Sequence, residues 1–295
     1  MGNLFEYTLK KLETSFVTKG VVKKINNDPS YDRVFGEKIC NIMLKMCDND
    51  MKSYDNAIKS LVNFSLEFLE LQSELEKTGS YKCKSFEEAR KKVYDNPDVM
   101  ENRYLNGLLL SQAFWINHYK MWGFFIEKFC NTGMNSGDVL EVPTGTGFLI
   151  SEFIRNNNVW DGTGYDLSKS SVEFSKKLVK MNNQSIRIEK ENVFDIPKEN
   201  KYDRIICGEL LEHLENPKDL LTKLKELVSD NGRIFLSTAI WAASPDHIYL
   251  FKNAEEVREM IIPYFNIKKE IVLNVFDNKS PEDEKTPINY ACILS

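Results

Sequence analysis

The sequence of 295 residues lacks any apolar run long enough to cross a membrane, since no stretch of about 18 uncharged apolar residues occurs. Hydrophobic residues still make up 42% of the chain and charged residues 28%, which is enough to bury a core and excludes a disordered chain. Residues 1–16 contain no apolar block followed by a small-residue cleavage site. We therefore expect no secretory signal, no membrane partner and a cytoplasmic location.

Cysteine pairs and histidines are scarce. The six cysteines include no CxxC pair, and the chain has only three histidines. Structural zinc sites need clustered cysteine and histidine ligands, so we expect no zinc site and assign no metal ligands from this sequence, and dependence on a divalent ion is left open. The cysteines are expected to be reduced and mostly buried.

The chain also lacks a strong excess of charge. Its formal net charge is −5, with 19 basic and 18 acidic residues in residues 1–135 and 20 basic and 26 acidic residues in residues 136–295. The densest basic runs are short and lie among acids, which is typical of solvated helix faces. A surface for a polyanion needs clustered cations, so nucleic acid is not the expected substrate.

The first part of the chain has the periodicity of helices. Apolar residues recur at spacings of three and four over residues 54–76, which places them along one side of a helix. Residues 102–129 follow the same spacing and are dense in aromatic residues. We predict an all-helical region over residues 1–135 that forms a lid or an acceptor pocket.

Residues 136–295 have a different pattern. The short β-type runs DVLEV, GTGYD, IRIEK, YDRIIC and GRIFLST alternate with helical segments, which predicts crossover connections and a mostly parallel sheet in an α/β fold. The final runs IKKEIVLNVF and INYACILS are joined only by a loop. Two such strands must pair antiparallel, because a parallel return needs a long crossover.

Ligands of open α/β sheets bind beyond the carboxyl ends of the strands, so the loops at those ends hold the candidate residues. The first loop follows a strand that ends in an acid, and its two glycines let the backbone approach a ligand closely. It does not match the dinucleotide pattern GxGxxG, because Ile150 occupies the third glycine position. The loop reads Glu141-Val142-Pro143-Thr144-Gly145-Thr146-Gly147.

The second loop contains Asp166, nineteen residues after Gly147, where an acid can accept hydrogen bonds from both hydroxyls of a ribose. The alternative is that Asp166 caps the next helix, although Ser168 is the better cap. The third and fourth loops follow the next two strands, and the third offers an apolar and aromatic pair suited to an adenine ring. These loops read Asn192-Val193-Phe194-Asp195-Ile196 and Gly208-Glu209-Leu210-Leu211-Glu212-His213-Leu214.

The ordered set EVPTGTG, GYDLS, NVFDIP and GELLEHL, with the antiparallel final strand, resembles the class I S-adenosylmethionine-dependent methyltransferases over residues 137–295. The resemblance implies a Rossmann-like sheet of seven strands with S-adenosyl-L-methionine as cofactor and S-adenosyl-L-homocysteine as product. One departure is Pro143, where the family usually has glycine. The cofactor-binding residues that it implies are Glu141, Pro143, Thr144, Gly145, Gly147, Asp166, Leu167, Ser168, Asn192, Val193, Phe194, Asp195, Glu209 and Leu210.

The methyl acceptor is narrowed by absent motifs. The chain has neither the Asn/Asp-Pro-Pro-Tyr signature after the fourth strand nor a Pro-Cys dipeptide, which argues against adenine or amide nitrogen and cytosine carbon as acceptors. Direct transfer to an oxygen or amine needs alignment and sometimes a base. The candidates for catalysis are Glu209, His213 and His247, with a purely structural role for His213 as the alternative.

For the acceptor pocket we predict Tyr104, His118, Tyr119, Trp241 and His247, and the alternative for the aromatic group is a core stripe. The leading hypothesis is methyl transfer to an oxygen or nitrogen of a small molecule, as in natural product biosynthesis. The alternatives are a methyltransferase for a peptide or protein side chain and a regulatory protein that binds the cofactor without turnover. The oligomeric state is left open.

Overall fold

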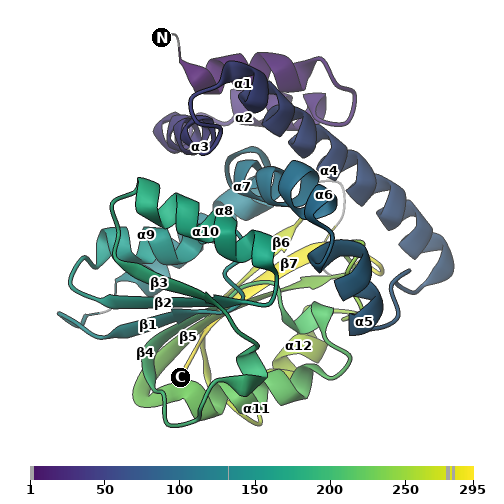
Figure 1. Cartoon of the computed structure of the whole chain (residues 1–295). Helices are drawn as coiled ribbons and strands as arrows, with labels where there is room; N and C mark the ends of the chain where they lie inside the picture. The colour runs from purple at the N-terminus through teal and green to yellow at the C-terminus, as the bar shows by residue number, and fades with distance from the viewer. Residues whose placement is uncertain (1–2, 132, 277–279, 281–282) are drawn as a thin grey trace.

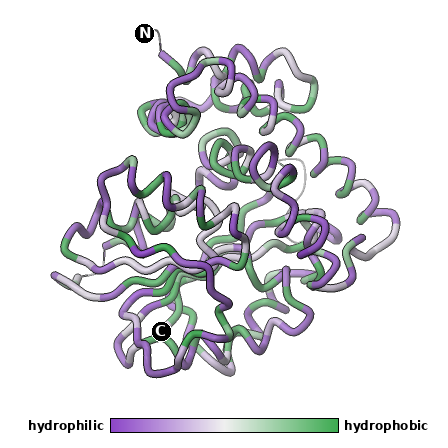
Figure 2. The backbone as a smooth tube through the Cα atoms, in the orientation of Figure 1, coloured by the Kyte–Doolittle hydropathy of each residue, from purple (hydrophilic) through white to green (hydrophobic). Residues whose placement is uncertain are grey.

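The computed structural model describes residues 3–131, 133–276, 280 and 283–295, and it consists of a helical region above a twisted sheet with helices on both faces (Figure 1). None of the described helices is both long enough and apolar enough to span a membrane. Hydrophobic residues run along the central strands, whereas the outer helices alternate between hydrophobic and hydrophilic positions (Figure 2).

Helices cover the described chain up to residue 130, which confirms the prediction of a helical region. The predicted aromatic helix over residues 102–129 is interrupted at Trp115, whose backbone is extended with φ −101° and ψ 117°. The α-helices are α1 (Leu4–Glu13), α2 (Lys19–Asn27), α3 (Arg33–Met46), α4 (Met51–Thr78), α5 (Phe86–Ala89), α6 (Pro97–Val99), α7 (Leu105–Phe114) and α8 (Ile116–Phe125). The π-helical segments are η1 (Arg90–Tyr94), η2 (Met100–Tyr104) and η3 (Ile126–Cys130).

Helix α4 is the longest element of this region, and both of its ends are capped. The side chain of Asp50 accepts a hydrogen bond from the backbone N–H of Ser53 at 2.8 Å. Gly79 ends the helix in the left-handed conformation with φ 70°, which glycine adopts without strain. These two signals determine where α4 begins and ends.

The sheet has seven strands and is parallel apart from its antiparallel last strand, as predicted, and the strand order is β3-β2-β1-β4-β5-β7-β6. Strands β1 to β5 pair in parallel, and β7 pairs antiparallel with both β5 and β6. The strands are β1 (Asp138–Glu141), β2 (Asp161–Asp166), β3 (Ile186–Lys190), β4 (Tyr202–Cys207), β5 (Val228–Ile240), β6 (Ile267–Asn274) and β7 (Ile288–Leu294). The remaining helices are α9 (Phe148–Asn156), α10 (Lys169–Met181), α11 (Pro217–Leu227), α12 (Ala254–Ile261) and the 3-10 turns η4 (Val193–Asp195) and η5 (Leu211–His213).

Two clusters of buried apolar side chains lie on opposite faces of the sheet. Successive residues of a strand point to opposite faces, so β1 contributes Val139 to one cluster and Leu140 to the other. The first cluster packs against α8, α9 and α10, and the second packs against α11 and α12. Both faces are therefore covered, as a parallel sheet requires.

The helical region shares the first of these cores. One continuous cluster includes Leu4 of α1, Phe125 of α8 and Phe235 of β5, and the rings of Phe125 and Phe235 meet edge to face at 5.0 Å. Helix α4 is also tied to the loop after β5, because Gln72 Oε1 accepts a hydrogen bond from the N–H of Ala243 at 3.0 Å. The helices are thus held over the carboxyl end of the sheet. A division into two parts at residue 135 stays a prediction.

Candidate active site

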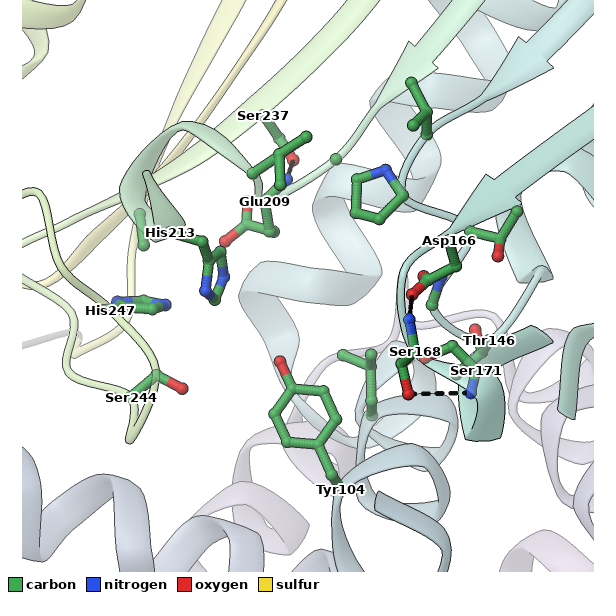
Figure 3. Close-up of a pocket in the computed structure, with 18 of the residues that line it drawn as sticks. Tyr104, Thr146, Asp166, Ser168, Ser171, Glu209, His213, Ser237, Ser244 and His247 are labelled. Carbon is green, nitrogen blue, oxygen red and sulfur yellow. Dashed lines mark hydrogen bonds between the residues drawn. The ribbon is translucent and has the colours of Figure 1, made fainter. Parts of the chain in front are cut away.

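A cavity of about 500 Å³ lies where the carboxyl ends of the strands meet the helical region. The loops after β1, β2, β3 and β4 form one wall, and residues of α4, η2, α7 and α8 form the other. Figure 3 shows Asp166 and Glu209 on the sheet side and Tyr104 approaching from a helix. The cavity is therefore built by both parts of the chain.

The loop after β1 places an acid and a tight turn at the cavity. Glu141 is buried, its Oε2 accepts a hydrogen bond from the N–H of Ile150 at 3.3 Å, and burial raises the pKa of this carboxyl well above its usual value. Gly145 has φ 50°, so glycine suits the turn. Pro143 and Thr144 line the cavity beside it, and the peptide bond before Pro143 is cis.

Asp166 ends β2 and organises the neighbouring loops. Its carboxylate accepts hydrogen bonds from the N–H of Gly145 at 2.9 Å and from the N–H of Ser168 at 2.8 Å. Burial raises the pKa of Asp166 to about 6, although both of these hydrogen bonds act to lower it. The alternative role as a helix cap falls to Ser168, whose Oγ accepts from the N–H of Ser171 at 3.4 Å (Figure 3).

The loop after β3 supplies an apolar edge to the cavity. Val193 is buried, Phe194 is 40% exposed, and both line the cavity together with Asn192 and Leu167. Asp195 differs from the prediction, since it is exposed and is not among the lining residues that the structure describes. Asn192 instead caps the 3-10 turn η4 by accepting from the N–H of Phe194 at 3.1 Å.

Gly147 also differs from its predicted role. It is outside the described lining of the cavity and begins α9 with φ 71°. A Cβ atom at this position would come within 2.9 Å of the Cβ of Ser175 on α10, which is closer than side chains tolerate. Gly147 is thus required by the packing of α9 against α10, whereas Gly145 is the glycine of the turn that faces the cavity.

The charges of the cavity suit a cationic ligand. Among the described lining residues there is no lysine or arginine, whereas seven are acids: Glu67, Glu141, Asp166, Glu191, Glu209, Glu215 and Asp219. Two buried oxygens at the cavity, Thr144 Oγ1 and Glu209 Oε1, have no hydrogen-bond partner in the described structure. These features fit a sulfonium cofactor, with Asp166 available to the ribose, Leu167 and Phe194 to the adenine, and Glu141 with the Gly145 turn to the methionine part.

The other end of the cavity is a cluster of acids and histidines. Glu209 lines the cavity and accepts a hydrogen bond from Asn289 Nδ2 at 3.1 Å, and its backbone has φ 50°. His213 follows on the 3-10 turn η5. The buried side chain of Glu212 accepts hydrogen bonds from Thr238 Oγ1 at 2.6 Å and from the N–H of Ala239 at 3.2 Å. Burial raises the pKa of both Glu209 and Glu212.

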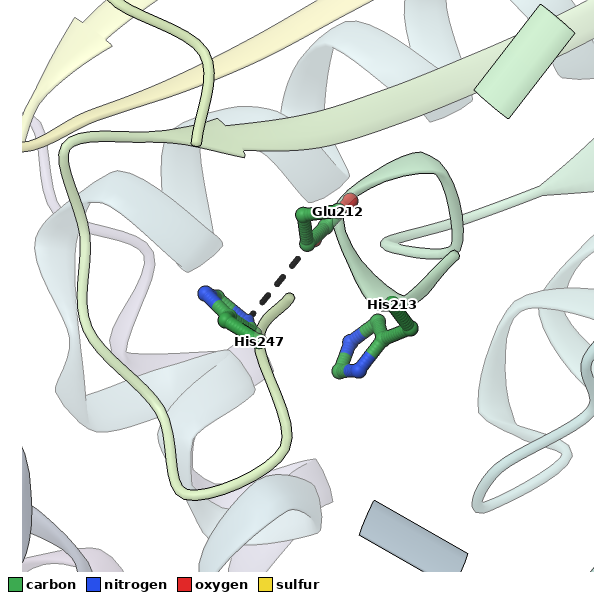
Figure 4. Close-up of side chains that lie close together, drawn as sticks. All are labelled: Glu212, His213 and His247. Atoms are coloured by element: carbon green, nitrogen blue, oxygen red, sulfur yellow. Dashed lines mark ion pairs between the residues drawn. The ribbon is translucent and has the colours of Figure 1, made fainter. Parts of the chain in front are cut away.

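Two histidines meet in this cluster, which we define as Glu209, Glu212, His213 and His247 and refer to as the polar cluster. The rings of His213 and His247 meet edge to face with centroids 4.8 Å apart. Burial, and then the nearby His213, lower the pKa of His247 to about 3, so this ring is neutral at physiological pH. Three histidines without a CxxC pair had predicted too few clustered ligands for a zinc site, but the fold brings two of the histidines next to Glu212 (Figure 4).

The helical wall is mostly aromatic. Tyr104 and His118 line the cavity as predicted candidates, and burial lowers the pKa of His118 to about 4. Tyr119 instead lies in the aromatic core, where its ring packs against the ring of Tyr31 at 4.5 Å. Trp241 is also outside the described lining and packs against the buried cluster of Leu75, Tyr81 and Ala243.

Sequence reasoning missed several lining residues of the helical wall. Phe64 and Phe68 lie four residues apart on α4, and the ring of Trp115 contacts both, at 5.1 Å and 5.8 Å between centroids. A spacing of four residues indicates one face of a helix. The predicted apolar side of residues 54–76 did not include these two rings. Other lining residues that were not predicted include Phe86, Tyr94, Met100 and Asn117 on the helical side and Ser237, Ser244 and Asn289 on or after strands.

The fold and this site define a class I S-adenosylmethionine-dependent methyltransferase. Residues 116–282, more than half of the chain, match the family described as "Methyltransferase domain", and the chain belongs to that family. S-adenosyl-L-methionine is the cofactor of this class, and it supplies the methyl group that is transferred. The match begins at Ile116 in α8, inside the predicted helical region.

Among curated proteins, the chain is similar to two bacterial ubiquinone biosynthesis O-methyltransferases. The protein of Dechloromonas aromatica is 30% identical over 126 residues, which cover 42% of this chain and 53% of that protein. The protein of Glaesserella parasuis is 27% identical over 183 residues, which cover 60% of this chain and 70% of that protein. The match thus spans about half the length of the first relative.

Among solved structures, an S-adenosylmethionine-dependent methyltransferase from Clostridium acetobutylicum is 13% identical with a TM-score of 0.46. The similarity covers 60% of this chain and 92% of that protein.

Proposed function

We propose that this protein transfers the methyl group of S-adenosylmethionine to an oxygen of a small, largely apolar molecule. The observation that carries the proposal is the single cavity that joins the cofactor loops to an aromatic helical wall and to the polar cluster. An acceptor held there lies between the cofactor and the polar cluster, so binding supplies the alignment that direct transfer needs.

The lining of the cavity supports a neutral aromatic acceptor. Aromatic rings of Phe64, Phe68, Tyr104 and Trp115 offer large apolar contacts to a planar molecule. The absence of lysine and arginine from the described lining disfavours acceptors that carry a carboxylate or phosphate. The relatives named ubiquinone biosynthesis O-methyltransferases favour oxygen over nitrogen as the methylated atom.

The polar cluster is suited to the proton of a hydroxyl acceptor. Methyl transfer to a hydroxyl oxygen leaves a proton that a base must accept. His247 is neutral, and His213 lies beside Glu209 at the cavity surface (Figure 3). We assign this proton transfer to the polar cluster as a group, which includes the three predicted candidates for catalysis.

The test is an acceptor panel with the purified protein and S-adenosylmethionine. The panel contains phenols and catechols, aliphatic amines, and peptides that carry glutamate or lysine, and mass spectrometry identifies the product. We expect a methyl ether from a phenolic acceptor. Methylation of only the peptides would support the protein-methylating alternative, and cofactor binding without turnover on any acceptor would support the regulatory alternative. Membership of natural product biosynthesis depends on which phenol is the acceptor.

A further inference from the structure

The polar cluster contains more ligand atoms than proton transfer requires. One potential ligand atom from each of Glu212, His213 and His247 lies within 4.8 Å of the other two (Figure 4). The three residues are 0%, 6% and 7% exposed, so water does not screen them. They come from the turn after β4 and from the loop after β5, which the fold holds together.

The hydrogen bonds of the two histidines leave the same ring atom of each without a proton. His247 Nδ1 lies 2.8 Å from the carbonyl oxygen of Ala242. His213 Nδ1 lies 2.9 Å from the hydroxyl of Tyr94 and 3.2 Å from the carbonyl oxygen of Asp246. A carbonyl oxygen only accepts and a hydroxyl can also accept, so we assign the proton to Nδ1 in both rings and a lone pair to Nε2. Histidines that bind metals usually donate their other N–H to a carbonyl or carboxylate in this way.

Two buried carboxyl oxygens beside the histidines have no hydrogen-bond partner in the described structure. Glu209 Oε1 is buried without a hydrogen-bond partner, and Glu209 interacts electrostatically with both Glu212 and His213. The Oδ2 atom of Asp246, a fully buried residue, also lacks a hydrogen-bond partner and lies 3.5 Å from His213 Nδ1. Burying several carboxylates without a compensating charge is costly.

Direct hydrogen bonding does not account for the arrangement. His247 Nε2 and Glu212 Oε1 are 4.0 Å apart, which is too long for a hydrogen bond. With the proton of His247 on Nδ1, this contact also joins two acceptors. Two acceptors at this separation are suited to a cation that both contact.

We propose that Glu212, His213 and His247 bind a divalent cation. Two imidazoles and a carboxylate form a ligand set that binds zinc while leaving a position open. Imidazole ligands favour zinc and similar transition metals, whereas magnesium and calcium favour oxygen ligands alone. The cation is therefore of the zinc class.

The location of the site connects it to the proposed function. His213 and His247 line the cavity, so the oxygen of an acceptor can reach a cation held by them. A hydroxyl bound to a divalent cation loses its proton more readily than a free one. The cation site itself rests only on the residues of the polar cluster and does not depend on the identity of the acceptor.

The test measures cation binding without any acceptor. The protein is freed of metal with a chelator and titrated with Zn²⁺ by calorimetry and with Co²⁺ by visible absorption, which reports nitrogen and oxygen ligation. We expect one equivalent of either cation and much weaker binding of Mg²⁺ and Ca²⁺. The variant His247→Asn should weaken Zn²⁺ binding about tenfold or more. Asparagine retains a donor for the Ala242 carbonyl.

His118→Gln is the matched control, because His118 lines the same cavity but bonds to Ser111 Oγ at 2.8 Å, away from the polar cluster. This variant should bind Zn²⁺ as the unmodified protein does. His213→Asn should also weaken Zn²⁺ binding. Binding of S-adenosylhomocysteine shows that each variant is folded. If the folded protein takes up neither cation, or if both asparagine variants bind Zn²⁺ normally, the site is refuted and only proton transfer remains for the polar cluster. That result would leave the proposed methyl transfer unaffected.

Discussion

The two walls of the cavity are constructed differently. The sheet wall takes its residues from short segments at the strand ends, and much of its geometry comes from backbone groups such as the N–H of Gly145 and Ser168. The helical wall and the polar cluster take single side chains from elements far apart in sequence, from Phe64 on α4 to His247 after β5. Recognition of the cofactor is therefore local, whereas recognition of the acceptor depends on the assembled fold.

The largest expected effect follows from removing the acid of the sheet wall. We predict that Asp166→Ala weakens S-adenosylmethionine binding about 100-fold or more, because two charge-assisted hydrogen bonds to the ribose are lost. The bond that fixes the Gly145 turn is lost as well. Calorimetric titration measures the change.

Asp195→Ala is the matched control for this change. Asp195 is an acid in the next strand-end loop, but it is exposed and outside the described lining of the cavity. This variant should bind the cofactor normally. Equal losses in both variants would contradict the placement of the ribose at Asp166.

A second change addresses the helical wall. Phe68→Ala removes a half-buried ring that lines the cavity, so we predict that the KM for the acceptor rises about tenfold, the loss expected for part of an aromatic contact. The KM for S-adenosylmethionine should stay the same, because we assign cofactor binding to the sheet wall. Steady-state kinetics with each substrate varied separately make the comparison.

Leu69→Ala controls for changes in α4 itself. Leu69 is the next residue on the helix, is 37% exposed and is not among the described lining residues. Its substitution should leave both KM values unchanged. A rise in the KM for the cofactor in Phe68→Ala would show that the two walls do not act separately.

The pH dependence of cofactor binding tests the sheet wall more finely. The pKa of Asp166 is about 6 in the free protein, and the ribose hydroxyls donate to the ionised carboxylate. Affinity for S-adenosylmethionine should therefore be constant above this pKa and fall about tenfold for each pH unit below it. Calorimetry between pH 5 and pH 8, compared with Asp166→Asn, measures this slope.

The stability of the free protein should depend on pH in the opposite direction. The pKa of Asp166 is higher in the folded protein than its usual value near 3.8, so the protonated carboxyl stabilises the free fold at low pH. This contribution is lost as the pH rises through about 6. Thermal unfolding without cofactor should show the loss in the native protein and not in Asp166→Asn. The same slope in the asparagine variant would assign it to another group.

The contrast between the walls also explains what the sequence could predict. The mostly parallel sheet and the position of Asp166 follow from local patterns, because alternation of strands and helices and an acid at a strand end are recorded in consecutive residues. His118 and Tyr119 were predicted to share the pocket, but successive residues on a helix point in directions about 100° apart. The cavity thus accepts one of them and the core takes the other.

Local sequence patterns could not predict the polar cluster, for a different reason. Glu212 and His213 are neighbours in the sequence, yet their partner His247 comes from a loop that only the pairing of β4 with β5 brings near. Trp241 and Ala242 are likewise neighbours after β5, and the positive φ of 49° at Trp241 turns the chain so that only Ala242 lines the cavity. Neither the polar cluster nor the turn at Trp241 gives a periodic pattern in the sequence.

The smallest effect is expected for Tyr119→Phe, which tests whether the aromatic core behaves separately from the helical wall. The hydroxyl of Tyr119 accepts a hydrogen bond from the N–H of Asp32 at 3.0 Å, and its loss should lower the free energy of unfolding by about 1 kcal/mol or less, because water can reach this exposed bond. Thermal unfolding measures that change, and acceptor kinetics should be unaffected. Tyr104→Phe is the matched substitution at the cavity. It removes a hydroxyl that can contact the acceptor, so the KM for the acceptor should rise about threefold. A change of acceptor KM in Tyr119→Phe equal to that in Tyr104→Phe would mean that the aromatic core and the helical wall respond to the acceptor as one unit.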